Sequence, residues 1–357
     1  MKISKNQVRK AGDIYRNYRV DTSISQEDYT KALEIITIFR SHHQNSLDSI
    51  LQTIDKSLKK LKIDNAIVAH RLKRSISIEK KLKRFPKMSL DRMQDIAGCR
   101  VIVKNYKDLR KLQKEFRDKF TLRHNYIKHP KDDGYRSIHY STKVDGYFVE
   151  IQIRTQMQHA WATALEIVDI FEKKSLKTKE DIQDNNSKLW MEFFKICSAV
   201  FQKYEFKNDL DYNELKRLFY YYNRLKIEKK FSAYKELPPL KNSAISKKDG
   251  YYLILIDLFN RKAKYFSFEK NGFKEAIENY QALEELYSTN PDIVVSLVAV
   301  EDLNNIKLAY PNFFADSQKF LELLKSLENI YKIEKESRGI VAIAVDFALT
   351  LMGKTQK

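Results

Sequence analysis

Residues 137–154 have the sequence SIHYSTKVDGYFVEIQIR, in which two alternating runs of polar and apolar residues are joined by Asp145-Gly146. An Asp-Gly pair between alternating runs predicts a two-residue β-hairpin, because a type I′ turn requires positive φ at both central positions. The predicted register places position 144 opposite 147, 141 opposite 150, 139 opposite 152 and 137 opposite 154. The segment therefore predicts two paired antiparallel strands of a larger sheet.

The two faces of this predicted hairpin differ in character, because side chains alternate along a strand. The apolar face holds Ile138, Tyr140, Val149, Ile151 and Ile153. The other face holds Ser137, His139, Ser141, Glu150, Gln152 and Arg154. Such a row is either a solvated sheet face or part of a functional site, and its mix of acid, imidazole and guanidinium suits a site.

Around the hairpin, hydrophobic periodicity predicts both helices and strands. Residues 27–84 have a helical pattern, which predicts two helices followed by a third over residues 65–84. A short β-rich run spans residues 99–104, and further helices are predicted over residues 107–120, 156–171 and 188–234. The predicted fold class is α/β, a mixed β-sheet flanked by helices.

A boundary is predicted at Pro238-Pro239 and the polar run 241–248. Beyond it the pattern predicts strands at 251–259, 264–268 and 293–300, and helices at 273–287 and 317–331. We therefore expect a first domain over residues 1–240 and a smaller α/β domain over residues 245–357. The apolar run 339–352 is short for a membrane span and predicts a buried C-terminal helix.

The chain has 357 residues and a formal net charge of +19, from 66 Lys and Arg against 47 Asp and Glu. A surplus of this size attracts polyanions such as nucleotides, RNA or an anionic membrane, although it also serves solubility alone. The two cysteines, Cys99 and Cys197, are far apart and predict neither a disulfide framework nor a metal site. Together with the lack of an apolar signal core at the start, this predicts a cytoplasmic protein.

Three segments carry candidate functional residues. The first is a basic segment that could bind phosphates or could be a solvated helix face, with Arg71, Lys73, Arg74, Lys80, Lys81, Lys83 and Arg84. The second is Asp95, which precedes the β-rich run and could hold a magnesium ion with Glu150, or could be a capping residue. The third is the loop 128–137, where Tyr135 could stack on a base or be a surface tyrosine.

The order and spacing of these segments resemble the RelA/SpoT synthetase domain over residues 65–171. The resemblance is carried by Arg71, by Asp95-Ile96-Ala97-Gly98 with Arg100, by residues 134–139 (GYRSIH), by residues 150–155 (EIQIRT) and by Trp161-Ala162. It implies a fold similar to that of nucleotidyltransferases. It also implies an enzyme that moves the β,γ-pyrophosphate of ATP to a ribose 3′-hydroxyl.

The resemblance further implies a role for each matching residue. Asp95 and Glu150 would hold magnesium, and Glu150 would also help to deprotonate the attacking hydroxyl. Arg71 and Arg100 would sandwich the adenine, and the ATP phosphates would bind Lys73, Ser77, Lys81 and Arg84. Tyr135 would stack on the acceptor base, and the acceptor pocket would be lined by Arg136, His139, Gln152 and Arg154.

The chain also departs from the usual family pattern. Arg74 and Lys80 stand where the family usually has Ser and Glu, and the family's Glu-His pair would fall on Leu165 and Glu166. Residues 158–164 (QHAWATA), together with a second domain of this size, resemble the CapRel-type fused toxin–antitoxin synthetases. That resemblance implies a C-terminal domain that restrains the enzyme until a phage protein is sensed.

Three functions are consistent with these observations. The first is a self-restrained toxin in anti-phage defence that pyrophosphorylates the 3′ CCA end of tRNA, which the extra cations favour. The second is a (p)ppGpp synthetase that uses GDP or GTP as acceptor in stringent-response signalling. The third is an inactive RNA-binding or sensor module, against which the presence of both Asp95 and Glu150 argues.

Overall fold

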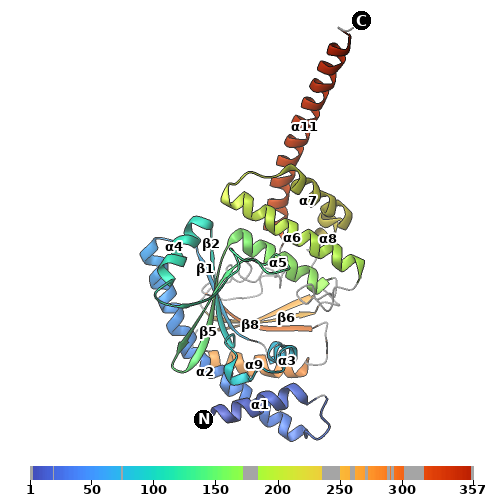
Figure 1. Ribbon diagram of the computed structural model, residues 1–357. Coiled ribbons are helices and arrows are strands. Elements are labelled where there is room, and N and C mark those ends of the chain that lie inside the picture. Colours follow the sequence, from blue (N-terminus) through green and yellow to red (C-terminus); the bar gives the residue numbers. More distant parts are fainter. Residues whose placement is uncertain are drawn as a thin grey trace. The chain divides into compact units, whose positions relative to one another are not determined.

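The computed structural model describes residues 3–18, 20–73, 75–171, 184–234, 250–257, 262–269, 272–287, 290, 293–300 and 317–354 (Figure 1). The chain divides into two compact units. The unit that we call the sheet unit comprises Met1–His129, Ser137–Gln156 and Glu236–Phe314. The helical unit comprises Pro130–Arg136, Met157–Lys235 and Ala315–Lys357.

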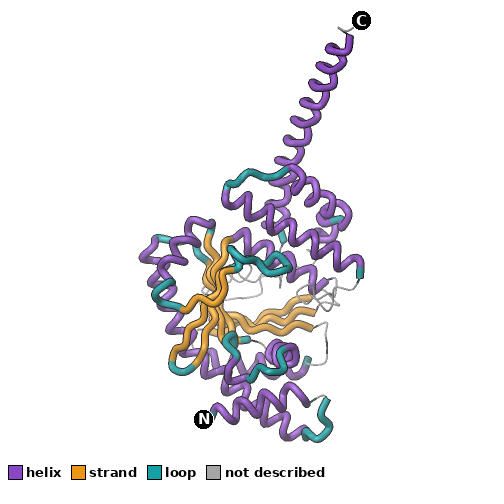
Figure 2. The backbone as a smooth tube through the Cα atoms, viewed as in Figure 1, coloured by secondary structure: helices purple, strands orange, loops and turns teal. Residues whose placement is uncertain are grey.

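The described strands of the sheet unit, orange in Figure 2, form one sheet. Their order is β3-β4-β5-β2-β1-β8-β6-β7. Strands β2 and β5 run parallel, whereas the other neighbouring strands are antiparallel. The sheet is therefore mixed and flanked by helices, as predicted. The strands are β1 (Ile67–Leu72), β2 (Ala97–Val103), β3 (Thr121–Asn125), β4 (Ile138–Val144), β5 (Tyr147–Thr155), β6 (Gly250–Asp257), β7 (Lys262–Glu269) and β8 (Ile293–Val300).

The hairpin of β4 and β5 has the predicted turn and register. Asp145 and Gly146 have φ values of 48° and 88°, which are the positive values that a type I′ turn requires. Position 144 pairs with 147, 141 with 150 and 139 with 152. Val149, Ile151 and Ile153 are fully buried, so the predicted apolar face is the face that packs into the core.

The predicted helix over residues 65–84 is wrong in its first half. Residues 67–72 form strand β1, and only Ser75–Arg84 is helical, as α3. Strand β1 pairs with β2 on one side and with β8 on the other. Hydrogen bonds to two neighbouring strands outweigh the local helix propensity of this stretch, which the sequence of residues 65–84 alone does not reveal.

The sheet unit also contains the helices α1 (Lys5–Asn17), α2 (Gln26–Leu61), α4 (Tyr106–Phe116) and α9 (Phe273–Leu286), and the short 3-10 helix η1 (Leu90–Arg92). Helix α2 is one helix of 36 residues instead of the two predicted, because no Gly or Pro interrupts it. Ser25 caps its start and Lys62, at φ 53°, ends it. Helix α4 ends at Phe116, earlier than predicted, and buries Leu109, Leu112 and Phe116.

The strands after residue 245 extend the first sheet, whereas the sequence predicted a separate small domain there. Strand β8 pairs with β1 at His70 and Ala299, and β6 and β7 follow it in the sheet. Helix α9 covers these strands through a cluster centred on Leu253, Tyr280 and Val295. The individual predictions of strands 251–259, 264–268 and 293–300 and of helix 273–287 match β6, β7, β8 and α9 to within a few residues.

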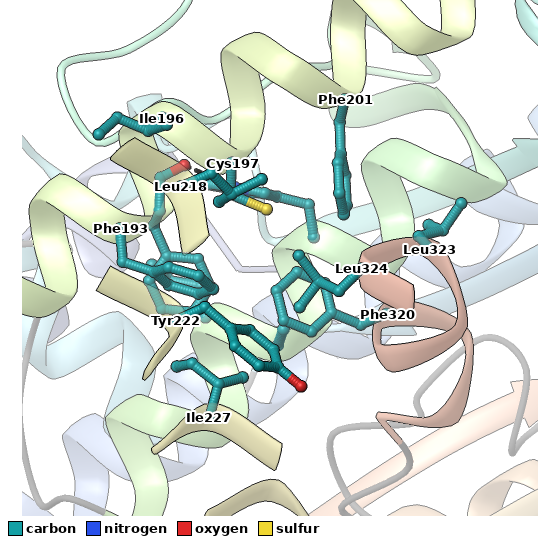
Figure 3. Packing of buried hydrophobic residues seen from close by; sticks show 14 of the residues in the cluster. Phe193, Ile196, Cys197, Phe201, Leu218, Tyr222, Ile227, Phe320, Leu323 and Leu324 are labelled. Atoms are coloured by element: carbon teal, nitrogen blue, oxygen red, sulfur yellow. Dashed lines mark hydrogen bonds between the residues drawn. The ribbon is translucent and has the colours of Figure 1, made fainter. Parts of the chain in front are cut away.

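The helical unit is built from α5 (Gln156–Phe171), α6 (Asn185–Phe206), α7 (Tyr212–Leu225), α8 (Ile227–Tyr234) and α11 (Gln318–Lys354). Its core joins α6, α7, α8 and the start of α11 through Phe193, Cys197, Leu218, Ile227 and Phe320, among others (Figure 3). The single helix predicted over residues 188–234 is in fact three helices. Lys207 and Lys226, both with positive φ, end α6 and α7.

Some predicted features fall outside the described residues. They are Arg74, the boundary at 238–248 and the side chains of residues 339–352. Within the described part of the chain, none of the helices has the length and apolar character needed to cross a membrane.

Candidate functional site

Polar side chains from four adjacent strands share one face of the sheet. In the strand pairing, Arg71 of β1 lies beside Gly98 of β2, Gly98 beside Glu150 of β5, and Glu150 beside Ser141 of β4. The next row joins Arg100, Gln152 and His139 in the same way. Paired residues point to the same side of a sheet, so the site predicted from the hairpin extends across β2 to β1.

Glu150 is held by its neighbours on this face. Its Oε1 lies 3.2 Å from His139 Nδ1, and its Oε2 accepts a hydrogen bond of 2.8 Å from Gln152 Nε2. Arg154 Nη2 in turn donates to Gln152 Oε1 at 2.8 Å. Burial raises the pKa of Glu150, but the hydrogen bonds from His139 and Gln152 and the positive charge of Lys73 outweigh it and lower the pKa to about 2. Glu150 is therefore a fixed carboxylate anion.

Asp95 lies two residues before β2 and is paired with two lysines. Its Oδ2 lies 2.9 Å from Lys73 Nζ and 2.7 Å from Lys81 Nζ. Burial raises the pKa of Asp95, but the two ammonium groups together lower it below its usual value. Its second oxygen, Oδ1, is buried and accepts no hydrogen bond from the described residues.

Lys73 links the two carboxylates. It bonds to Asp95 directly, and its charge is among the causes that lower the pKa of Glu150. Its backbone N–H donates to Ile96 O at 2.7 Å, which fixes it at the end of the β1–β2 pair. Two ionised carboxylates near one cation, with a buried oxygen of Asp95 still lacking a partner, are a donor set that fits magnesium. Among the described residues, no group of three or more His, Cys, Asp or Glu side chains is arranged so that it could hold a metal ion by itself.

Helix α3 presents several predicted phosphate ligands. Ser77, Lys81 and Arg84 are spaced by four and three residues and so share one side of the helix. Ile78 and Leu82 are fully buried on another side. The sequence predicted that Arg71 lies on this helix, but Arg71 lies on β1. Lys73 lies between β1 and α3. Lys73 and Lys81 nevertheless meet at Asp95.

Two aromatic residues that sequence reasoning missed lie beside His139. Tyr126 meets the His139 ring edge-on at 5.2 Å between centroids and stacks on His124 at 5.0 Å. A bulge in β3 creates this arrangement, because Leu122 pairs with Tyr140 whereas His124 pairs with His139. Residues two apart in a regular strand share a face, so the bulge sends Leu122 and His124 to opposite faces. An irregularity of this kind leaves no clear sequence signal.

Tyr135 and Arg136 belong to the helical unit. The Tyr135 backbone N–H donates to Asp133 Oδ1 at 2.8 Å, and Lys131 Nζ lies 5.0 Å from the centre of the Tyr135 ring. Arg136 Nε donates to Ser198 Oγ at 2.9 Å. Arg136 lines a small cavity of about 10 Å³, together with Gln158, Gln202 and Glu205. The loop predicted over residues 128–137 is thus present and ordered by hydrogen bonds.

A family model described as the region found in RelA / SpoT proteins matches residues 70–184. We call residues 70–184 the RelA/SpoT-type region after this match. The two carboxylates, α3 and the polar rows of the sheet all fall within this region or at its first strand. The RelA/SpoT-type region thus coincides with the residues that the structure brings together.

Curated relatives align over the same part of the chain. A probable chloroplastic GTP diphosphokinase, RSH3, from Arabidopsis thaliana is 35% identical over 130 residues, which is 34% of this chain and 18% of the relative. The uncharacterized protein Rv1366 of Mycobacterium tuberculosis is 34% identical over 111 residues, which is 29% of this chain and 39% of the relative. The chain therefore spans well under half the length of these relatives.

Among solved structures, the small alarmone synthetase 1 from Bacillus subtilis bound to its product pppGpp is 25% identical to the chain. The match covers 47% of this chain and 92% of the synthetase, with a TM-score of 0.37. A TM-score of this size supports no conclusion about fold or function. The CapRel-type fusion that the sequence suggested does not appear among these findings and stays a prediction.

Proposed function

We propose that the RelA/SpoT-type region is an ATP-dependent pyrophosphokinase that transfers the β,γ-pyrophosphate of ATP to a ribose 3′-hydroxyl. The observation that carries this proposal is the pair of ionised carboxylates, Asp95 and Glu150, set among Lys73 and Lys81. Phosphoryl transfer requires few covalent steps from the protein, so positioning and charge neutralisation provide most of the rate enhancement. The polar face provides both.

Asp95 and Glu150 would hold a magnesium ion, and the buried Oδ1 of Asp95 is an oxygen that such an ion would satisfy. When bound, the ion neutralises charge on the triphosphate oxygens. Lys73 and Lys81 contribute positive charge at the same place, and Ser77 and Arg84 extend this cationic side along α3. The triphosphate would lie along this side of α3.

The positions of the other predicted site residues on the polar face of the sheet suggest how each would bind a substrate. Arg71 and Arg100, on adjacent strands, would hold the adenine between their guanidinium planes. Glu150, kept ionised by its neighbours, would accept a hydrogen bond from the attacking hydroxyl and orient it. His139, Gln152 and Arg154 would line the acceptor side of the sheet face, and the acceptor contacts expected of Tyr135 and Arg136 stay predictions.

Two acceptors are candidates, and a different observation favours each. A guanosine 5′-diphosphate or triphosphate is favoured by the relatives that are named probable GTP diphosphokinases. The 3′ CCA end of tRNA is favoured by the net charge of +19, because each phosphate contact with a cation releases counterions and strengthens polyanion binding. A toxic role through translation arrest would follow from the second acceptor.

The test is to incubate the purified full-length chain with ATP labelled in the γ-phosphate and with GDP, GTP or deacylated tRNA. Label in a nucleotide or in tRNA supports the pyrophosphokinase and identifies its acceptor. Asp95→Asn should lower the transfer rate by roughly 10²–10³-fold, because it removes one of the two carboxylates that would hold the magnesium ion. The control is Asp55→Asn, since Asp55 also pairs with a lysine, Lys59 at 2.8 Å, but on the exposed side of α2.

A fold check keeps this test interpretable. Asp95→Asn should lower the thermal midpoint, because it leaves Lys73 and Lys81 without their acid, but it should keep one cooperative transition. Transfer measured well below that transition then reports a loss of chemistry. If the wild type transfers no label to any acceptor, or if Asp95→Asn transfers as fast as Asp55→Asn, the pyrophosphokinase proposal is wrong. The inactive RNA-binding module would then be the better description.

We also propose that residues after 245 regulate this site. The support is a pair of contacts within the sheet unit. Arg40 of α2 donates a hydrogen bond to Ser75 at the start of α3, and it lies 3.8 Å from Glu284 of α9. A change at α9 therefore reaches the phosphate-binding helix through one buried side chain. Nothing in the described residues bears on a phage protein as the trigger.

A further inference from the structure

A groove lined by cations lies on the sheet unit, away from the candidate site. Its volume is about 590 Å³. No Asp or Glu is among its described lining residues, whereas six cations are, namely Lys107, Arg110, Lys111, Lys114, Arg117 and Lys128. The groove therefore carries a concentrated positive charge.

Most of the charge follows one side of α4. Lys107, Arg110, Lys111 and Lys114 are spaced by three, four and seven residues, which places them on one side of the helix. At 1.5 Å per residue they cover roughly 10 Å along the helix axis. The cations thus form a linear row and not a single point of charge.

The acids of α4 do not neutralise this row. Glu115 forms ion pairs with two lysines that do not line the groove, Lys60 at 2.9 Å and Lys119 at 2.6 Å. Asp108 lies 3.5 Å from Lys111, which is the one groove cation with an acidic partner among the described residues. Like charges three and four residues apart destabilise a helix by about 0.2–0.5 kcal/mol per pair, so this row opposes folding unless an anion binds it.

The groove lies on the opposite face of the sheet from Glu150. Tyr140, which lines it, alternates with His139 and packs against Phe116 of α4 at 5.7 Å between ring centroids. Leu122 also lines it, because the bulge in β3 turns Leu122 away from the His139 face. A triphosphate bound at Asp95 and Glu150 therefore does not occupy the groove, and its cations need a different ligand.

We infer that this groove binds the phosphodiester backbone of a nucleic acid, as a docking surface separate from the pyrophosphokinase site. A backbone presents a row of single negative charges, which a linear row of cations in a concave surface matches. An anionic membrane would favour a flat basic surface with several exposed apolar side chains, whereas Leu122 is the one exposed large apolar residue in this hollow. The proposal does not depend on which acceptor the enzyme uses.

The test measures binding of the full-length chain to a fluorescent 20-nucleotide RNA and to DNA of the same sequence by anisotropy, over a series of salt concentrations. The groove variant Lys107→Gln/Arg110→Gln/Lys114→Gln removes three charges. The control variant Lys216→Gln/Lys229→Gln/Lys335→Gln also removes three exposed charges, from α7, α8 and α11. The thermal midpoint of the control variant should equal that of the wild type, because its side chains lie on helix surfaces. That of the groove variant should be equal or slightly higher, because it removes like-charge pairs on α4.

We expect the groove variant to bind at least tenfold more weakly than the control at the same salt concentration. We also expect the plot of log K against log salt concentration to become shallower by about 2, because each of the three lost phosphate contacts with a single strand contributes roughly 0.7 to the slope. Equal affinity for RNA and DNA would show that the groove recognises the phosphates alone. A higher affinity for RNA would show that it also contacts the 2′-hydroxyl groups. The proposal is overturned if the wild type binds neither polymer, if both variants bind equally, or if the groove charges are needed for anionic vesicles and not for nucleic acid.

Discussion

Glu150 has an environment that predicts the pH dependence of folding. Its pKa is lowered from 4.5 to about 2, so the unfolded chain binds a proton at Glu150 more readily than the folded chain does. The stabilisation is complete above about pH 4.5 and is lost as the pH falls towards 2. The free energy of unfolding of the wild type should therefore exceed that of Glu150→Gln by on the order of 3 kcal/mol at pH 6, and this difference should shrink as the pH falls.

Urea unfolding of both proteins between pH 3 and pH 6 measures that difference. His139→Ala provides a second check, because it removes one of the groups that lower the pKa of Glu150. In that variant the total loss of stability should be smaller, and it should be complete at a higher pH, because the pKa of Glu150 in the folded chain is higher. A difference between wild type and Glu150→Gln that stays constant over this range would contradict the assignment of Glu150 as a fixed anion.

Substitution of two glycines with positive φ distinguishes the energetic cost of backbone strain from that of a steric clash. A Cβ atom at Gly146, with φ 88°, would meet nothing within 4 Å, whereas at Gly134, with φ 94°, it would lie 3.0 Å from Ser198 Cβ and 3.3 Å from two backbone atoms. Gly146→Ala should cost about 1 kcal/mol of folding free energy through strain alone. Gly134→Ala should cost roughly 1–3 kcal/mol more, because the neighbouring backbone must shift.

Chemical denaturation of the two variants side by side measures these costs, and each variant is the control of the other. Equal losses would show that the contact at Gly134 relaxes without penalty. Transfer activity gives a second readout, since Gly134 precedes Tyr135 and Arg136 whereas Gly146 lies at the far end of the hairpin. Only Gly134→Ala should change the affinity for the acceptor.

Elements with a local signal were predictable from the sequence, and elements set by distant partners were not. The hairpin of β4 and β5 was predicted to the residue, because its turn and alternation lie within 18 residues of sequence. Strand β1 was missed because its partners are a strand about 30 residues later and another that begins at Ile293. The same contrast holds for the site, where Glu150, His139 and Gln152 were grouped correctly but Tyr126 was missed.

The cationic side of α4 shows a further limit of sequence reasoning. The spacing of its apolar residues Leu109, Leu112 and Phe116 identifies the helix. The same spacing does not show that the lysines between them line a groove. The groove needs Lys128 from beyond β3 as well, and only the three-dimensional structure brings it next to α4. Local spacing identifies a charged helix side, but not whether a second element turns that side into a hollow.

Arg40 links three helices of the sheet unit. It is 1% exposed, donates to Ser75 Oγ of α3 at 2.7 Å, and lies 5.2 Å from the centre of the Tyr280 ring of α9. Glu284, 3.8 Å away, accepts a hydrogen bond of 2.7 Å from Tyr280. Arg40→Met should therefore destabilise the fold by about 3 kcal/mol, because it leaves the partly buried Glu284 carboxylate without its cation.

The double variant Arg40→Met/Glu284→Gln tests this reason directly. Removing the acid as well should recover much of the loss, and a double-mutant cycle from thermal or urea unfolding gives the coupling energy. Glu284→Gln alone should also change the Michaelis constant for ATP if α9 acts on α3 through Arg40. Additive losses in the cycle would contradict the proposed link between these two helices.

At the scale of the whole molecule, the residues after 241 complete both units. Strand β8 pairs with β1, and the cluster of Leu253, Tyr280 and Val295 belongs to the sheet unit. Phe320 and Leu324 of α11 lie in the core of the helical unit (Figure 3). Truncation near Lys241 would thus expose an edge of β1 and remove part of a core, and it would not simply release a restrained enzyme.

Deletion of residues 242–357 should therefore lower the thermal midpoint by roughly 10 °C or more and cause association through the uncovered strand β1. Deletion of residues 339–357 is the matched control, because the described members of the helical core in α11 end at Tyr331. Size-exclusion chromatography and thermal unfolding compare both with the full chain. A monomeric 1–241 protein with an unchanged midpoint would show that β6, β7 and β8 dock on a finished fold, and the separate domain predicted from the sequence would then be the better description.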